Sequence, residues 1–423
     1  MNIIENNKVK EKLYVEKLEN GLTIMVLPRK NVRKKYIICG PRFGSIDNKF
    51  IIPGKKEETV LPDGVAHFLE HKMFEQKSGI NSLDTLTAIG VNANAYTTND
   101  HTAYLYEATD NFYDALDEYM DYIQNPYYTD ENVEKEKGII AQEIKMYEDY
   151  PEWQVYLNAL KCMYKELPIR LDIAGTVESI SHITKEMLYD CYNNFYTPSN
   201  MAMAICGDFE PEKILEEIKK RVTIKENKEL PKRIYPKEQE EVNEKEMIVQ
   251  MELSNPIFGI GFKDKVEDNM VKKHIAIEII LNTLLGKSSK LYKELTDDNT
   301  LLGTLDLEYE YSREYAFVLI TGQSRKPKKV YERINKEIEN AIKNGLNSED
   351  FERNKKKIYG DYITEYNSVE DTARMFLADY FKGVNSFEYL EEYTNVTKEY
   401  AEEILREVFD LNKEVLSIVE GNE

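Results

Sequence analysis

Three side chains in one short segment could act together on a single metal ion. His67 and His71 are four residues apart, and Glu70 directly precedes His71. Because residues i and i+4 share one face of a helix, both imidazoles could bind the same ion if this segment is helical. Catalytic zinc usually has three protein ligands and keeps a fourth position for water, whose proton a nearby carboxylate can accept. The spacing H-x-x-E-H therefore predicts a hydrolytic zinc site with Glu70 as the general base.

A third ligand has to come from another part of the chain. The best candidates are Glu143 and Glu136, which are seven residues apart and would share one helix face. A buried side of this helix is indicated by its apolar residues, which are Val133, Ile139, Ile140 and Ile144. A lone carboxylate beside that side would be costly, and a cation would offset the cost. We expect Glu143 to be the ligand, with Glu136 in a supporting position or as an alternative donor. Two solvated charges on a lysine-rich helix remain the alternative.

The elements that would position these residues are predicted twice along the chain. In the first half they are a strand at 21–28, the helix containing His67, an edge-like strand at 102–108, and helices at 112–123 and 130–147. In the second half they are a strand at 247–262, a helix at 272–285, a strand at 315–322, and helices at 329–343 and 348–366. Thr129 and Ser348 are the expected N-caps of the helices that follow them. This order indicates an α+β fold made of two similar halves, each a sheet backed by helices.

The boundary between the halves is predicted from composition. Residues 225–245 are rich in charge and proline and contain little that could pack. We therefore predict a zinc-binding domain at 1–225, a linker at 226–245 and a second, homologous domain at 246–423. The stretch of the second half that corresponds to the metal-binding helix, Leu281–Gly286, contains no ligand. We expect only the first domain to bind zinc in this way.

Composition excludes several classes of protein. The 423 residues include 77 Asp and Glu against 56 Lys and Arg, for a formal charge of −21, which disfavours nucleic acid as a partner. No apolar stretch approaches the roughly 18 residues of a membrane span, and the N-terminus has no apolar signal core. The cysteines form no C-x-x-C pair and are expected to be buried thiols; they are Cys39, Cys162, Cys191 and Cys206. We expect a cytoplasmic protein that does not associate with membranes.

These motifs together resemble the pitrilysin/insulinase family of zinc peptidases, also called inverzincins. Glu143 follows His71 by 72 positions, close to the separation usual in that family. Further matches are Gly44-Ser45, Asn94-Ala95-Tyr96-Thr97 and Pro198-Ser199-Asn200-Met201. The resemblance covers nearly the whole chain. It is strongest to bacterial two-domain members that pair with a related half-enzyme lacking zinc.

The resemblance implies a role for each matching residue. His67, His71 and Glu143 would hold one zinc ion per chain, Glu70 would be the catalytic base, and Glu136 would orient a ligand. An extended peptide would add a strand to a sheet edge formed by two segments, which are Asn94, Ala95, Tyr96 and Thr97, and residues 104–107. The resemblance also implies that the two domains, each a mostly antiparallel sheet backed by helices, form half of a clamshell.

One departure from the family concerns catalysis and partners. Family members usually have in their second half an Arg, and a Tyr seven residues later, that contact the substrate carbonyl, whereas this chain has Thr296 and Gly303. Losing such groups typically costs on the order of 100-fold in rate. We expect a homodimer, or a heterodimer with a related zinc-less chain that supplies the Arg and Tyr; a homodimer would not restore the pair.

Three functions remain open from the sequence. The first is a zinc-dependent peptidase that hydrolyses peptide bonds in oligopeptides or unstructured segments. The second is a catalytically weak assembly or processing subunit that works only with a partner chain. The third is a peptide-binding or metal-storage protein without enzymatic activity. The presence of all candidate ligands and of Glu70 favours the first. The other histidines, His101, His182 and His274, are expected to have structural or surface roles.

Overall fold

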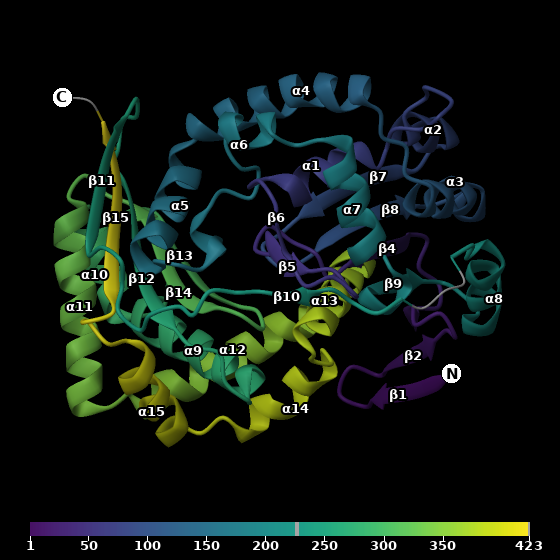
Figure 1. Cartoon of the computed structure of the whole chain (residues 1–423). Coiled ribbons are helices and arrows are strands. Elements are labelled where there is room, and N and C mark those ends of the chain that lie inside the picture. Colours follow the sequence, from purple (N-terminus) through teal and green to yellow (C-terminus); the bar gives the residue numbers. More distant parts are fainter. Residues whose placement is uncertain (225–227, 422–423) are drawn as a thin grey trace. The chain divides into compact units, whose positions relative to one another are not determined.

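The computed structural model describes residues 1–224 and 228–421, in which strands and helices form two compact units (Figure 1). Unit 1 comprises Met1–Ile144, Asp172–Tyr235 and Ile363–Ser386, and unit 2 comprises Lys145–Leu171, Pro236–Tyr362 and Phe387–Glu423. Each unit contains a mostly antiparallel sheet with helices packed against it. The predicted α+β class with two sheet-and-helix domains is therefore confirmed. The bounds predicted from the sequence, 1–225, 226–245 and 246–423, stay a prediction, and residues 225–227 lie outside the described part.

The main sheet of unit 1 has seven strands in the order β1-β2-β3-β9-β4-β8-β7. These strands are β1 (Asn2–Asn6), β2 (Glu11–Lys17), β3 (Thr23–Pro28), β4 (Lys35–Pro41), β7 (Asn92–Thr97), β8 (Thr102–Ala108) and β9 (Met201–Gly207). Only β3 and β9 run parallel. Strand β7 is the last in this order and therefore an edge strand. Strand β8 pairs with both β4 and β7 and is therefore an interior strand. The expectation that residues 104–107 form a sheet edge is therefore wrong.

Helices cover the apolar face of this sheet. They include α1 (Val65–Lys72), α2 (Ser82–Ile89), α3 (Phe112–Gln124), α4 (Asp130–Glu148), α6 (Val177–Ser181), α7 (Lys185–Phe195) and α8 (Pro211–Arg221). Tyr104 and Tyr106 of β8 are fully buried in the same core as Tyr119 and Tyr122 of α3. A second, small sheet contains β5 (Lys49–Ile51), β6 (Glu58–Val60) and β10 (Lys232–Arg233). A short 3₁₀ turn, η2 (Pro198–Asn200), leads into β9.

Unit 2 has a five-stranded sheet in the order β11-β15-β12-β14-β13. Its strands are β11 (Glu246–Met251), β12 (Ile257–Asp264), β13 (Leu302–Tyr311), β14 (Ala316–Gln323) and β15 (Glu414–Gly421). Its helices are α5 (Pro151–Met163), η1 (Pro168–Arg170), α9 (Met270–Leu285), α10 (Lys290–Asp297), α11 (Pro327–Asn344), α12 (Ser348–Glu365), α14 (Phe387–Asn395) and α15 (Lys398–Val408). Like the first sheet, it has a single parallel pair, β11 with β15.

Each half of the sequence contributes one helix to the other half's sheet. Helix α13 (Val369–Lys382) packs on β4 and β9 of unit 1. Met203 belongs to the helix-covered core, so the alternate residues Ala202 and Ala204 face the other way, and their small side chains allow close approach. Helix α5 packs on β12 and β15 of unit 2. There a Cβ on Gly259 would lie 2.8 Å from Val155 Cγ1. The two exchanged helices follow α4 and α12, as expected for a duplicated chain.

Two local predictions were wrong in ways that have a clear reason. The single strand expected at 247–262 is two strands, because the chain turns between β11 and β12. Ser348 is not the N-cap of α12: the side chain of Asn347 accepts a hydrogen bond from the backbone N–H of Asp350 at 3.0 Å. Thr129 was predicted correctly, since its hydroxyl accepts from the N–H of Asn132 at 3.1 Å.

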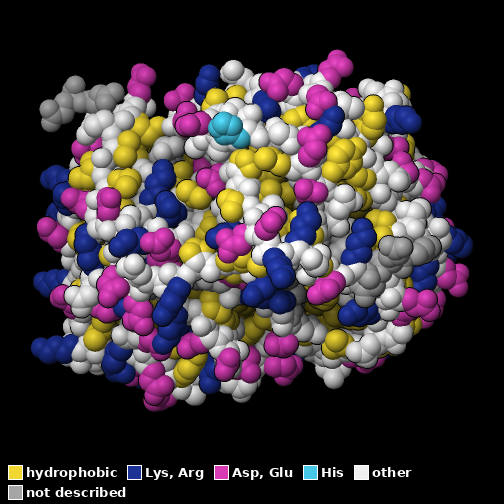
Figure 2. Space-filling view, viewed as in Figure 1, with side chains coloured by type: hydrophobic (Ala, Val, Ile, Leu, Met, Phe, Trp, Pro, Cys, Tyr) yellow, Lys and Arg dark blue, Asp and Glu magenta, His cyan; other side chains and the backbone are white. Residues whose placement is uncertain are grey.

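The charged surface and the buried cysteines are those expected from the composition of the sequence. Acidic side chains lie among basic ones on the face shown in Figure 2. Within residues 1–224 and 228–421, no helix combines the length and the apolar character that crossing a bilayer requires. All four cysteines are free and buried. Burial raises the pKa of the Cys39 thiol to about 12, so this thiol stays protonated and unreactive.

Candidate metal centre

Helix α1 carries the two histidines and is anchored by apolar neighbours. Phe68 and Leu69 are fully buried, which fixes the rotation of the helix. Its start requires Gly64, whose φ is 91° and whose Cβ, if present, would lie 2.3 Å from the carbonyl oxygen of Ala174. His67 and His71 are thereby brought together with ring centroids 4.6 Å apart. The predicted helix and its shared face are present.

Helix α4 brings two glutamates to the same place. Val133, Ile140 and Ile144 are buried and hold the helix against unit 1, whereas Ile139, expected on the buried side, is 48% exposed. Glu136 is buried, and the side chain of Glu143 is 25% exposed. The seven-residue spacing therefore does place both carboxylates on one face.

The three candidate ligands converge within unit 1. Nε2 of His67 lies 3.7 Å from Oε1 of Glu143, and Nε2 of His71 lies 3.4 Å from Oε2 of the same carboxylate. One ligand atom from each of the three residues lies within 4.8 Å of the others. Ligands at 2.0–2.2 Å in a tetrahedral zinc site are roughly 3.3–3.6 Å apart. Two imidazole nitrogens and one carboxylate also form the donor set that zinc prefers in hydrolytic sites. The residues fit a zinc ion.

Glu136 supports this arrangement from behind. Its Oε1 accepts from Nδ1 of His71 at 3.1 Å, which leaves Nε2 of that ring facing Glu143. Its Oε2 accepts from Nζ of Lys72 at 3.2 Å. Nδ1 of His67, by contrast, is buried and has no hydrogen-bond partner in the described part of the chain. Glu136 therefore lies where an orienting residue for His71 would lie, and that role stays a prediction; His67 has no corresponding partner at Nδ1 among the described residues, and its Nε2 lies near Glu143.

Glu70 lies beside the candidate ligands in a nearly closed environment. Its side chain is buried, and its Oε2 accepts a 2.6 Å hydrogen bond from the hydroxyl of Thr97 on β7. Burial raises the pKa of Glu70, and the hydrogen bond from Thr97 opposes part of that rise. A carboxyl group with a raised pKa is better suited to exchange protons near neutral pH. The predicted role of Thr97 in binding substrate stays a prediction, and its hydroxyl donates to Glu70.

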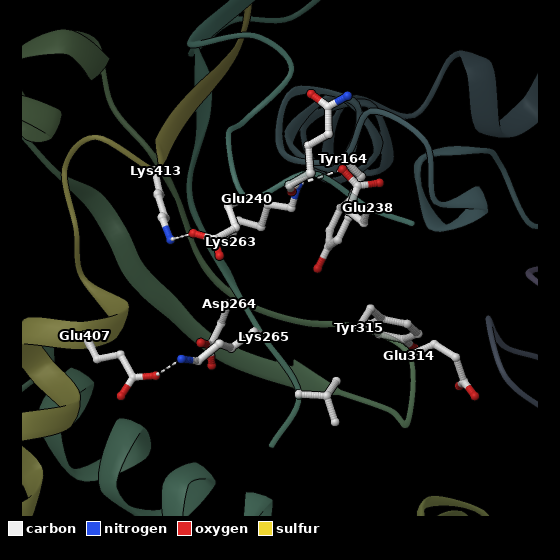
Figure 3. A pocket seen from close by; sticks show the side chains of 12 residues that line it. Tyr164, Glu238, Glu240, Lys263, Asp264, Lys265, Glu314, Tyr315, Glu407 and Lys413 are labelled. Carbon is white, nitrogen blue, oxygen red and sulfur yellow. Dashed lines mark hydrogen bonds and ion pairs between the residues drawn. The ribbon is translucent and has the colours of Figure 1, made fainter. Parts of the chain in front are cut away.

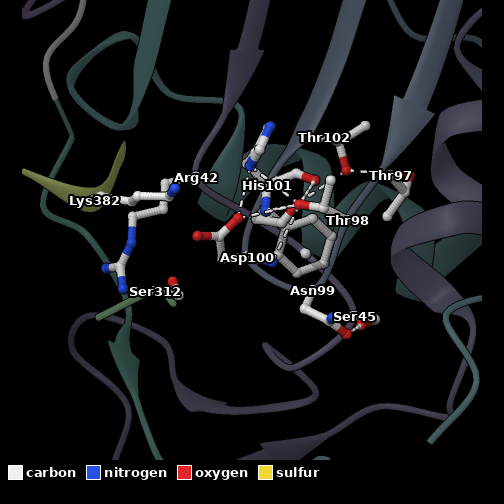
Figure 4. Close-up of polar contacts among 12 residues, drawn as sticks. Arg42, Ser45, Thr97, Thr98, Asn99, Asp100, His101, Thr102, Ser312 and Lys382 are labelled. Atoms are coloured by element: carbon white, nitrogen blue, oxygen red, sulfur yellow. Dashed lines mark hydrogen bonds and ion pairs between the residues drawn. The ribbon is translucent and has the colours of Figure 1, made fainter. Parts of the chain in front are cut away.

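The other predicted substrate residues lie along the same strand. Asn94 is exposed, and Ala95 and Tyr96 are partly exposed. The ring of Tyr96 is covered by the guanidinium of Arg374 from α13, 5.0 Å from the ring centroid. The turn that joins β7 to β8 is fixed by polar contacts, in which Nδ1 of His101 meets Asp100 at 2.6 Å (Figure 4). These contacts join β8 to β7, the terminal strand of the described sheet.

Sequence reasoning missed one contact at this centre, that of Thr97 with Glu70, and one residue, Lys72. The role of Thr97 in holding Glu70 had no signal in the sequence, because it depends on the pairing of β7 with β8. Lys72 did have a signal. It stands between His71 and Met73 in a segment whose apolar residues are fully buried, and a lysine at such a place needs an acidic partner.

The cavity shown in Figure 3 is lined by residues of unit 2. Its volume is about 380 Å³. The charged groups that line it bind one another, as when Lys263 donates to Glu238 at 2.7 Å and Lys413 lies 3.4 Å from Glu240. None of the predicted site residues lines it. We therefore assign no chemistry to this cavity.

The surroundings shift the pKa values of the two histidines in opposite directions. Burial lowers the pKa of His67 to about 4, and the neighbouring charge on His71 contributes to this. Burial also opposes charge on His71, but hydrogen bonds to Glu136 and Glu143 outweigh it and raise its pKa to about 10. In the metal-free protein His71 therefore keeps a proton that an incoming cation has to displace.

The metal-free protein is expected to lose stability as the pH rises toward about 10. A raised pKa means that the folded state binds the proton of His71 more tightly than the unfolded state does. The contribution of this proton to the free energy of unfolding is therefore complete below about pH 6.5 and is lost as the pH passes through about 10. Urea unfolding with a chelator present, at several pH values, measures this. A His71→Gln variant should show a smaller decline, since lysines and tyrosines also titrate near this pH; the same pH dependence in both proteins would show that His71 does not contribute to it.

Two family models match the chain. A model described as "Insulinase (Peptidase family M16)" matches residues 50–177, which include every candidate ligand. A model described as "Peptidase M16 inactive domain" matches residues 182–358, which contain none of them. The two matches thus separate a ligand-bearing part from a ligand-free part, as the unequal halves of the sequence do.

Known proteins resemble the chain over nearly its full length. The "Uncharacterized zinc protease YmfH" of Bacillus subtilis is 38% identical over 410 residues, which are 96% of this chain and 95% of that protein. A putative M16-like peptidase from Alicyclobacillus acidocaldarius has a TM-score of 0.93 and 32% identity, covering 99% of this chain and all of that one. The periplasmic protease PqqL of Escherichia coli shares the fold, with a TM-score of 0.75 and 16% identity, over 99% of this chain but only 48% of its own.

Proposed function

The chain belongs to the insulinase family of peptidases, family M16, and from this premise we propose that it hydrolyses peptide bonds with one zinc ion held by His67, His71 and Glu143. The observation that carries the proposal is the convergence of these three side chains within 4.8 Å, next to the buried carboxyl of Glu70. Relatives named zinc proteases support the choice of metal. A donor set of this kind with a neighbouring free carboxylate is the arrangement of a hydrolytic zinc site.

Glu70 is the proposed general base. When bound, zinc supplies a Lewis acid that acidifies water and polarises a peptide carbonyl. Glu70 accepts the proton of the attacking water and later returns it to the leaving amine. The hydroxyl of Thr97 donates to Oε2 of Glu70, and we assign the proton transfer to the other carboxylate oxygen, Oε1. Glu136 holds His71 in the orientation that the metal requires.

The substrates we propose are oligopeptides or unstructured segments. Strand β7 ends the seven-stranded order, so an extended peptide could pair with its free side through backbone hydrogen bonds. Asn94, Ala95, Tyr96 and Thr97 lie on this strand, and Thr97 also contacts the base. A peptide paired here would therefore lie next to Glu70. Backbone pairing selects for an extended chain more than for particular side chains.

A partner chain is the second part of the proposal. Thr296 lies on α10, where its hydroxyl donates to the carbonyl of Tyr292 at 3.0 Å, and Gly303 lies on β13. Neither position offers a cationic or phenolic group to a substrate carbonyl. The chain also corresponds in fold to about half of PqqL. We propose that a related zinc-less chain supplies an Arg and a Tyr, and that the isolated chain is a weak peptidase. A homodimer is the alternative, and it would leave the Arg and Tyr missing.

We also propose a cytoplasmic location, with which the free, buried thiols agree.

Removal and return of the metal test the function. We expect the purified chain to contain one zinc ion and to cleave unstructured peptides in a quenched-fluorescence library, slowly alone and on the order of 100-fold faster with its partner. A chelator should abolish cleavage, and stoichiometric zinc should restore it. Cleavage that persists after the protein is shown to be metal-free would contradict the proposal. Equal rates with and without the partner would contradict its second part only.

A further inference from the structure

Lys72 follows directly after His71 and is entirely enclosed. Its side chain is 0% exposed, and its ammonium group lies 2.6 Å from Oε1 of Glu75 and 3.2 Å from Oε2 of Glu136. Phe68 and Leu69, one turn before it on α1, are apolar and fully buried. A buried ammonium in such surroundings is strongly destabilising unless carboxylates accompany it.

The contacts of Lys72 continue to a candidate metal ligand. Glu136 has two carboxylate oxygens, one of which accepts from Lys72 and the other from Nδ1 of His71. Bonding of both oxygens to different donors fixes the plane of the carboxylate, because rotation would break both bonds. The ring of His71 is in turn fixed with Nδ1 toward Glu136 and Nε2 toward Glu143. Four side chains thus form one continuous chain of contacts, from Glu75 through Lys72 and Glu136 to His71.

We propose that Lys72 is a positioning residue of the metal centre: by fixing Glu136, it fixes the ring of His71 in the orientation that presents Nε2 to the metal. The inference rests on the proposed function, since it concerns the same site. Lys72 does not touch the candidate ligands' coordinating atoms. It acts through Glu136, as supporting residues behind metal ligands commonly do.

A second buried lysine provides a matched control. Lys273 of α9 is also 0% exposed, and it is paired with Asp264 at 2.9 Å and with Glu267 at 3.1 Å. Like Lys72 it is an enclosed ammonium paired with carboxylates, but it lies in unit 2, and the carboxylates that it contacts, including that of Glu407 at 3.4 Å, are not candidate ligands. Loss of either lysine should lower stability, whereas only the loss of Lys72 should weaken the metal site.

The affinity for zinc is the measurement that separates these roles. Zinc binding to the full chain is measured by competition with a chromophoric chelator, at one pH and without substrate. We expect Lys72→Met to weaken binding by about 10- to 100-fold, the usual cost of removing a supporting residue, and Lys273→Met to change it by less than about 3-fold. Urea unfolding of the metal-free variants shows that both are folded. If Lys72→Met does not fold, Lys72→Gln takes its place with the same expected direction.

A double variant tests whether the effect passes through Glu136. If Lys72 acts only by fixing that carboxylate, Lys72→Met combined with Glu136→Gln should bind zinc about as weakly as Glu136→Gln alone. Losses that multiply, or unchanged affinity in Lys72→Met, would overturn the inference. A wild-type chain that binds no zinc would instead overturn the proposed function, so the two failures can be told apart.

Discussion

Replacing Glu70 by glutamine is expected to reduce peptide hydrolysis by about 10²- to 10⁴-fold, the range contributed by a positioned general base. Glutamine has nearly the same size and can still accept the hydrogen bond from Thr97 at the buried position. It cannot accept the proton of water. Because Glu70 is not among the three converging ligands, zinc content should stay at one ion per chain. Single-turnover assays with metal analysis of the same sample measure both quantities.

A carboxylate elsewhere in unit 1 serves as the control for this change. Glu107 on β8 pairs with Lys34 at 2.9 Å and is remote from the candidate ligands in sequence and contacts. Glu107→Gln should leave both turnover and zinc content unchanged. If Glu70→Gln retained full turnover with zinc bound, Glu70 would not be the base. Loss of zinc in that variant would mean that Glu70 is needed to hold the metal.

Replacing Glu143 by alanine is expected to weaken zinc binding by on the order of 100-fold and to remove activity at limiting zinc. Structural zinc sites with four ligands have binding free energies of about 10–16 kcal/mol, so one ligand contributes roughly 3 kcal/mol. The fold should tolerate the change, because the side chain of Glu143 is partly exposed and the buried residues that anchor α4 remain. Chelator competition and urea unfolding measure the two effects.

The matched control lies on the same helix. Glu134 is 75% exposed and forms a surface ion pair with Lys137 at 3.1 Å, so Glu134→Ala should change neither zinc affinity nor stability by more than a small amount. Equal zinc affinities for Glu143→Ala and Glu134→Ala would remove Glu143 from the ligand set. Excess zinc should partly restore the activity of Glu143→Ala, since Glu70 and both histidines remain.

The parts of the site that depend on local periodicity could be predicted from the sequence. His67 and His71 share a face because any helix places residues i and i+4 together, and Glu136 and Glu143 share one for the same reason. The order of strands and helices also gave the α+β class and the duplication. These predictions need only the period of an element and the apolar residues that anchor it.

The rest depends on contacts between residues far apart in sequence. The position of β8 inside the sheet, rather than at its edge, follows from its pairing with both β4 and β7. The exchange of α5 and α13 between the sheets depends on small residues such as Ala202 and Gly259, which carry no periodic signal of their own. The bond from Thr97 to Glu70 likewise exists only after β7 is placed beside α1. No local pattern encodes such pairings.

Anomalous diffraction at the zinc absorption edge, from crystals of the zinc-loaded chain, is the most direct measurement of the metal site. One peak is expected within about 2.0–2.2 Å of Nε2 of His67, Nε2 of His71 and a carboxylate oxygen of Glu143. Glu70 should lie near this peak without binding it. A fully loaded crystal with no peak between these three side chains, or with its zinc bound elsewhere, would contradict the assignment.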